Sequence, residues 1–186
     1  MKQLILPFLL FITSFSYSQS KKKFIKEGNK LYNDSSYNMA EMKYRKSLEK
    51  DQEYFNASFN LADAVYKQER YDESTSFFES LKDNARNDKE LADINHNLGN
   101  SLLKENKIDL SIEAFKNSLR LNPDDEDTRY NLAYAQKMKQ QQDQKDQQKD
   151  QKDQQQDQKD QQQDQKDQQQ DQKDQQTDQK KDEMSK

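Results

Sequence analysis

The middle of the chain repeats itself with a period of about 34 residues. In each period a small residue is followed sixteen residues later by an aromatic one, and the pairs are Gly28 with Tyr44, Ala62 with Phe78 and Gly99 with Phe115. The first two pairs lie 34 residues apart and the third follows after 37, so three extra residues are predicted within 83–90. A period of this length is typical of solenoids, in which one unit cannot bury its apolar face alone and neighbouring units share a continuous core.

The apolar spacing within each period predicts helices. Apolar residues recur at i, i+3, i+4 and i+7, and the chain has only two glycines, so strands are not indicated. We therefore expect an all-α fold in which the small residues, Ala133 among them, lie where paired helices cross. Helix pairs are predicted at about 21–54, 55–91 and 92–125, followed by a closing helix at about 126–139. Pro123 ends the last pair, because proline is not tolerated inside a helix.

The third unit carries the residues that identify the repeat. Leu98, Gly99, Phe115 and Pro123 stand at the spacing of the tetratricopeptide pattern, although Asn95 replaces its tryptophan. Residues 21–138 thus resemble a tetratricopeptide repeat domain, which implies a helix-hairpin solenoid. The residues that carry this signature through the three units are Gly28, Ala40, Tyr44, Leu61, Ala62, Phe78, Leu98, Gly99, Phe115 and Pro123.

The last part of the chain has a different composition. Met184 is the only apolar residue after position 138, and from Gln151 the sequence QKDQQQD recurs every seven residues. A coiled coil is disfavoured because these heptads contain no apolar residue for the seam. Residues 140–186 are therefore predicted to form a disordered polar tail that acts as a tether, or as a spacer or weak ligand for cations or cell-wall polymer.

The N-terminal residues are predicted to form a secretory signal peptide. Lys2 precedes an apolar run from Leu4 to Ile12, and small residues at positions 16 and 18 favour cleavage before Gln19. The chain contains no cysteine, which excludes lipoprotein processing and any disulfide framework. We expect residues 1–18 to be removed and the protein to be exported to the periplasm or cell envelope; an uncleaved anchor is the alternative.

Composition argues against several classes of function. The formal net charge is −4, so a nucleic-acid footprint is not expected. His96 is the single histidine, and it is not part of a nearby set of cysteine, aspartate and glutamate residues with metal-ligand spacing. The sequence contains no glycine-rich phosphate loop. We therefore expect no catalytic residues, no cofactor and no metal, and contact with a membrane only through partners.

The resemblance implies a site for a protein segment. In tetratricopeptide domains the first helix of each pair lines a concave groove, mainly through positions 2, 5, 6, 9, 12 and 13. Asparagine side chains can pair with a peptide backbone, and tyrosine offers apolar area with a polar tip. Transferred to this frame, the groove residues are Asn29, Tyr32, Phe59, Asn60, Asp63, Tyr66, Lys67, His96, Asn97, Asn100, Lys104, Tyr130, Asn131 and Tyr134.

One subtype of the family, which clamps an acidic C-terminal carboxylate, is not expected. Its two asparagines are matched here by Asn29 and Asn60. Its three basic residues are not, because Ile25, Asp93 and Asn97 stand at those positions. This groove should therefore prefer a neutral or weakly polar segment.

The architecture resembles a narrower group. The stretch NLGNSLLKENKIDLSIEAFKNSLRLNPDDEDTRYNLAYAQ, with a signal peptide before it and a glutamine-rich tail after it, is similar to the exported BatC-type tetratricopeptide proteins of bacterial aerotolerance operons. That resemblance implies an envelope adaptor that works beside von Willebrand factor A domain proteins in stress tolerance. Two alternatives are a scaffold for outer-membrane, secretion or cell-wall machinery, and a regulatory subunit of a peptidoglycan enzyme.

Overall fold

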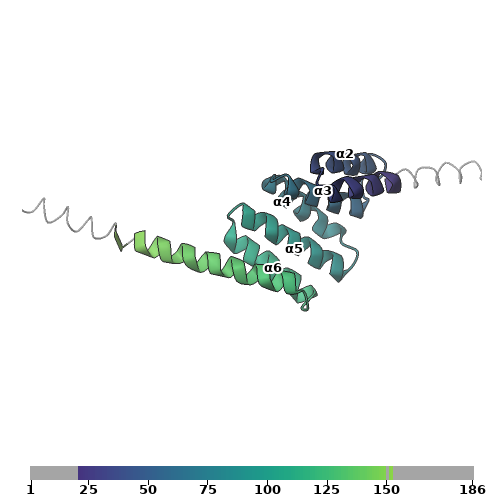
Figure 1. Cartoon of the computed structure of the whole chain (residues 1–186). Helices are drawn as coiled ribbons and strands as arrows, with labels where there is room; N and C mark the ends of the chain where they lie inside the picture. Colours follow the sequence, from purple (N-terminus) through teal and green to yellow (C-terminus); the bar gives the residue numbers. More distant parts are fainter. Residues whose placement is uncertain (1–20, 150, 153–186) are drawn as a thin grey trace, which may run out of the picture. The chain divides into compact units, whose positions relative to one another are not determined.

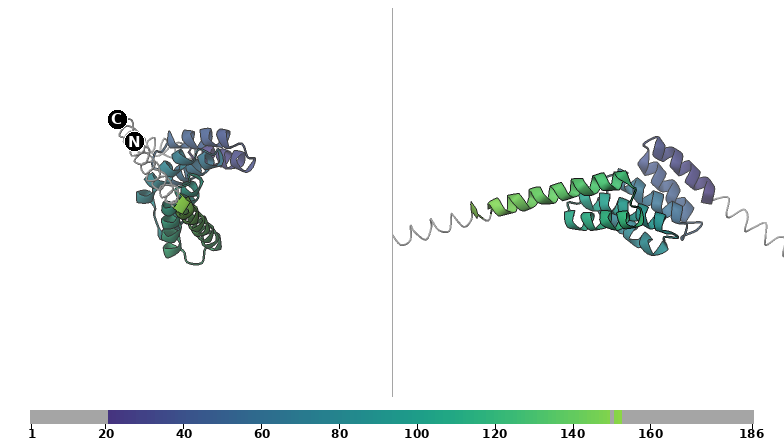
Figure 2. Two further views of the ribbon diagram at one scale, coloured as in Figure 1. Left: turned by 90° about the vertical axis from the view of Figure 1, so that its left-hand side faces the viewer. Right: turned by 90° about the horizontal axis from the view of Figure 1, so that it is seen from below.

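The computed structural model describes residues 21–149 and 151–152, and within them all regular structure is helical. The elements are a first helix at 21–33, α2 (Tyr37–Leu48), α3 (Phe55–Lys67), α4 (Tyr71–Leu81), the short 3₁₀ helix η1 (Lys82–Asn84), α5 (Asp88–Lys104), α6 (Ile108–Leu121) and a closing helix at 126–149 (Figure 1). Consecutive helices from α2 to α6 pack on one another (Figure 2). The predicted all-α helix-hairpin solenoid is confirmed.

The three hairpins share one turn geometry. Ser35, Glu69 and Asn106 each have a positive φ, at 57°, 62° and 61°. After each of them the chain makes the same backbone hydrogen bond to the preceding helix, such as Arg70 N–H to the Val65 carbonyl at 3.3 Å. A left-handed residue at this point satisfies carbonyls at the end of a helix. The repeat in the sequence is therefore also a repeat in backbone conformation.

Small residues bring the paired helices close together. A Cβ atom added to Gly28 would lie 2.5 Å from Cε1 of Tyr44, and one added to Gly99 would lie 2.6 Å from Cδ1 of Phe115. Ala133 was expected in the same role, and this prediction is wrong, since Ala133 is exposed. Within the described ranges no second helix of a pair follows it, because residues 126–149 form one helix.

The core is made of the apolar residues that the repeat pattern singles out. Tyr44, Phe78 and Phe115 are 1%, 0% and 0% exposed, respectively, so each is fully buried against its own first helix or the next one. Buried serines cross-link the hairpins: the Ser111 hydroxyl donates to the Gly99 carbonyl at 2.7 Å, and the Ser118 hydroxyl to the Ala92 carbonyl at 2.9 Å. Among the described residues no buried side-chain nitrogen or oxygen lacks a hydrogen-bond partner.

Two boundaries differ from the simple 34-residue frame. The extra residues predicted within 83–90 are taken up by η1 and by the first turn of α5, which has 17 residues where α3 has 13. Helical residues continue beyond the expected end at 139: residues 140–149 and 151–152 are helical, with exposed side chains. The beginning of the segment expected to be disordered is thus helical. Residues 153–186 and the predicted signal peptide at 1–18 lie outside the described residues.

The closing helix ends the solenoid with a polar face. Thr128 and Ala135 are fully buried, whereas Arg129, Ala133 and Gln136 are exposed. In the third unit the residues at the positions of Arg129 and Gln136 are Asn95 and Leu102, and both are buried. Polar residues at these positions are what a terminal capping helix needs. None of the helices in the described part of the chain is long and apolar enough to cross a membrane.

Candidate functional site: a polar groove along the first helices

The first helices of the pairs bring most of the predicted groove residues together. They line two adjoining hollows, which share Tyr32 and Asp63. The N-terminal hollow, of about 260 Å³, is lined by Asn29, Tyr32, Asn33, Tyr44, Asn60 and Asp63. The C-terminal hollow, of about 650 Å³, is lined by Tyr32, Asp63, Tyr66, Lys67, His96, Asn97, Asn100, Leu103, Lys104, Tyr130, Asn131 and Tyr134.

Phe59 is the exception among the predicted groove residues. Its ring centroid lies 6.0 Å from that of Phe55 and 5.5 Å from that of Phe78, and it packs against the core cluster. It lines neither hollow. In the third unit the same repeat position holds the polar residue His96, which lines the groove. A phenyl ring gains more free energy by burial in the adjacent apolar core than by facing the groove.

Asparagine side chains link neighbouring first helices across the groove. In the N-terminal hollow the Asn29 Oδ1 accepts from the Tyr44 hydroxyl and from Asn60 Nδ2, both at 2.9 Å. In the C-terminal hollow Asn131 Nδ2 donates to Asn100 Oδ1, also at 2.9 Å. These bonds fix the amide planes and leave the other polar atom of Asn60 and of Asn100 available to a ligand.

The point between the two hollows carries a carboxylate surrounded by phenols. Burial raises the pKa of Tyr32 strongly, and its hydrogen bond to the Asp63 carboxylate raises it further. Burial also raises the pKa of Tyr44 to about 12, with a smaller contribution from the charge of Asp63. The pKa of Tyr66 is raised in the same way, by burial first and then by Tyr71 and Asp63. All three phenols are therefore neutral donors at physiological pH.

His96 is held by two residues that the sequence reasoning missed. Its Nδ1 lies 2.5 Å from the Thr128 hydroxyl, which donates in turn to Asp125 Oδ2 at 2.7 Å. Asp125 Oδ1 also accepts from the Thr128 backbone N–H at 2.9 Å, as an N-cap residue does. Burial would raise the pKa of Asp125, but the two Thr128 hydrogen bonds and the nearby imidazole hold it below its ordinary value. The sequence carries one signal for this contact: the Asp-x-x-Thr spacing at the start of the closing helix is typical of a helix N-cap.

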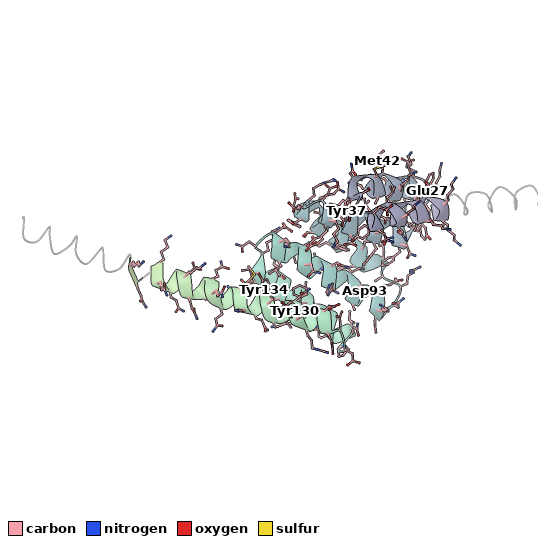
Figure 3. All side chains as sticks on the ribbon, in the orientation of Figure 1. Glu27, Tyr37, Met42, Asp93, Tyr130 and Tyr134 are labelled. Atoms are coloured by element: carbon pink, nitrogen blue, oxygen red, sulfur yellow. The ribbon has the colours of Figure 1, made fainter. Side chains whose placement is uncertain are left out.

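The C-terminal hollow has a cationic edge and an aromatic wall. Lys67 and Lys104 are exposed, and the Lys67 ammonium lies 5.8 Å from the Tyr66 ring centroid. Tyr130 and Tyr134 project from the closing helix (Figure 3) and are 72% and 50% exposed. Exposed tyrosines at the wall of a hollow offer contact area to a ligand at low entropic cost.

The site is built for recognition by hydrogen bonding and packing. Asn97 Nδ2 donates to the Asp93 carbonyl at 3.1 Å, so its Oδ1 faces no partner in the described residues, while Asn100 keeps a free Nδ2. One free acceptor and one free donor, three residues apart on α5, match the alternating groups of an extended peptide backbone. In the described ranges there is no group of three His, Cys, Asp or Glu residues that could hold a metal ion.

Stacked helix hairpins with a polar groove along their first helices define a helical-repeat recognition domain. Two family models match the chain, one described as tetratricopeptide repeat over residues 25–89 and one as TPR repeat over residues 99–140. The chain is therefore a tetratricopeptide repeat protein.

Solved structures of tetratricopeptide domains have the same fold. The first TPR of Spaghetti (RPAP3), bound to an HSP90 peptide, matches with a TM-score of 0.61 at 17% identity, covering 65% of this chain and 94% of that one. The N-terminal domain of stress-induced protein-1 from C. elegans matches with a TM-score of 0.57 at 20% identity, covering 64% of this chain and 97% of that one. MamA from Desulfovibrio magneticus RS-1 matches with a TM-score of 0.60 at 20% identity, covering 64% of this chain and 66% of that one. No curated protein matches the chain in sequence.

Proposed function

We propose that the chain is an exported, non-catalytic adaptor that binds an extended segment of a partner protein in the groove along its first helices. The observation that carries the proposal is the convergence of the predicted polar and aromatic residues on two adjoining hollows. The tetratricopeptide fold supports a protein partner, and one structural neighbour, the first TPR of Spaghetti (RPAP3), is bound to the HSP90 peptide SRMEEVD.

The class of segment differs from that acidic peptide. The positions of Ile25, Asp93 and Asn97 lack the basic residues that a carboxylate clamp uses, and the centre of the groove holds a carboxylate at Asp63. A segment with neutral polar side chains, whose backbone pairs with Asn97 and Asn100, suits this lining better.

The setting is proposed from the sequence. A predicted signal peptide and a glutamine-rich tail resemble the exported proteins of aerotolerance operons, so we propose a cell-envelope complex with von Willebrand factor A domain proteins that supports resistance to oxidative stress. The adaptor would hold such partners together without chemistry of its own.

Capture from solubilised envelopes tests both parts. The full chain is compared with Asn97→Ala/Asn100→Ala, which removes groove amides, and with Asn38→Ala/Asn117→Ala, which removes amides from the second helices α2 and α6. We expect von Willebrand factor A domain proteins to be recovered by the wild type and the control and lost with the groove variant. Equal recovery by the groove variant would overturn the site, and recovery of only cell-wall enzymes or secretion components would overturn the complex.

A further inference from the structure

We propose that Asp63 forms a subsite for one lysine or arginine side chain of the segment bound in the groove. The inference rests on the proposed function and adds a chemical requirement to the partner. It predicts a segment that is neutral along most of its length and basic at one position.

Asp63 is placed where the repeat otherwise has an amide. The same position is Asn29 in the first unit and Asn100 in the third. Asn29 and Asn100 each pair with an asparagine on the first helix of the next unit or on the closing helix, Asn60 and Asn131, at 2.9 Å. In the second unit the corresponding side chain is a carboxylate that accepts from the Tyr32 phenol. The exchange adds one negative charge between the two hollows.

That charge has no counterion among the residues that the structure describes. No basic nitrogen of the described residues lies within 4.0 Å of the Asp63 carboxylate. Other half-buried carboxylates in the same ranges do have one, as Glu105 has Lys107 at 2.7 Å and Asp51 has Lys21 at 2.5 Å. Asp125, which lacks an ion pair, is satisfied as a helix cap. A partly buried carboxylate without a cation gains most from an external one.

The surroundings of Asp63 suit a cation. The phenols of Tyr32 and Tyr66 stand beside it, each packed edge to face against another tyrosine, Tyr37 at 5.2 Å and Tyr71 at 5.3 Å. Aromatic rings attract ammonium and guanidinium groups through their negative faces. Asn60 donates its Nδ2 to Asn29, so its Oδ1 remains as a further acceptor in the hollow.

The distribution of charge gives the subsite a position and a direction. Among the described residues, Asp63 is the only charged one that lines the N-terminal hollow, whereas the C-terminal hollow is lined by Lys67 and Lys104 as well as by Asp63. A basic side chain is therefore favoured on the N-terminal side of Asp63 and repelled on the other side. An acidic side chain at the same point of the segment would meet Asp63 directly.

A peptide array tests the subsite on the full chain. Each peptide has randomised neutral residues around a fixed central residue, which is Lys, Arg, Gln or Glu, and dissociation constants are measured for the strongest binders. We expect Lys and Arg peptides to bind about tenfold more tightly than Gln peptides, and Glu peptides to bind most weakly. Asp63→Asn, the residue of the neighbouring units, should remove this preference. Asp72→Asn makes the same change at an exposed residue of α4 and should retain the preference for Lys and Arg peptides.

The outcomes separate the two proposals. If neutral peptides bind and Asn97→Ala/Asn100→Ala abolishes their binding, but Lys and Arg give no advantage, the subsite is wrong and the groove stands. A basic preference that survives Asp63→Asn also overturns the subsite. If no peptide of any composition binds, the proposed function fails and the subsite fails with it.

Discussion

The two glycines of the chain set how closely paired helices approach. Gly28 and Gly99 lie against the rings of Tyr44 and Phe115 on the facing helix, with no space for a Cβ atom. The second unit solves the same problem with Ala62 against Phe78. The contact is therefore adjusted unit by unit, and the size of the small residue depends on how its aromatic partner packs.

Gly99→Ala should destabilise the protein. The added Cβ would lie 2.6 Å from two ring atoms of Phe115, and overpacking of this kind costs about 1–3 kcal/mol. Alanine regains up to about 1 kcal/mol of helix propensity, so we expect a net loss near the lower end. Urea unfolding followed by circular dichroism measures it. Ala133→Leu, at the same repeat position but exposed, should change stability by less than about 0.5 kcal/mol. An equally stable Gly99→Ala protein would show that the Phe115 ring can move.

Side chains that follow the repeat frame were predictable, and those that depend on a missing neighbour were not. The frame located Gly28, Gly99 and the asparagines of the groove. It failed at Ala133, because whether a second helix covers that residue depends on where the solenoid ends. It also failed at Phe59, whose ring packs against Phe55 and Phe78 in the core instead of lining the groove. Thr128 was missed because its role requires His96 on a helix distant in sequence.

At the scale of helices, polar links join one repeat to the next. Glu41 on α2 accepts from Gln68 Nε2 at 2.8 Å and from Arg70 Nη1 at 2.7 Å, both at the turn between α3 and α4. One repeat later the corresponding residues are Thr75 and Glu105, and their hydrogen bond has the opposite polarity. The geometry of the joint is thus kept while donor and acceptor are exchanged, which a sequence pattern based on residue type does not reveal.

Glu41→Gln should weaken the first joint in a pH-dependent way. Burial would raise the pKa of Glu41, but hydrogen bonds from Gln68, Arg45 and Arg70 outweigh it and lower the pKa below 4.5. The contribution is therefore present above about pH 4.5 and lost as pH falls through the folded-state pKa. We expect a loss of about 1–2 kcal/mol near pH 7 that shrinks near pH 3. Glu49→Gln, exposed at the end of α2, is the control in urea unfolding; a loss independent of pH would contradict the ionic link.

The ends of the helices were less predictable than their existence. Residues 126–152 contain no glycine or proline, so no helix-breaking residue marks a helix end near 139. Glutamine and lysine, which make up most of 140–149, are good helix formers. Composition indicates that this segment has no core to join, but it does not by itself end a helix. The sequence predicted that three extra residues lie within 83–90, but not that they add a turn to α5, because extra residues can lengthen either a loop or a helix.

At the scale of the repeat domain, stability in a solenoid is a sum over neighbours, so features confined to some units affect those units first. The phenols with raised pKa belong to the first two units, at Tyr32, Tyr44 and Tyr66. In the third unit the residues corresponding to Tyr44 and Tyr66 are Phe115 and Leu103. The N-terminal part of the domain is therefore the part whose stability depends on keeping phenols neutral.

Alkaline pH should unfold that part first. An unfolded tyrosine ionises near pH 10, whereas burial raises the pKa of Tyr44 to about 12. Its contribution is fully present below about pH 10 and is lost as pH rises through about 12. We expect the urea midpoint to be constant from about pH 7 to 9.5 and to fall above it. The urea midpoint of Tyr44→Phe should fall less steeply with pH. Because Tyr130 is 72% exposed, the midpoint of Tyr130→Phe should follow that of the wild type. A midpoint that stays constant to about pH 11 would mean that these phenols ionise without opening the first two units.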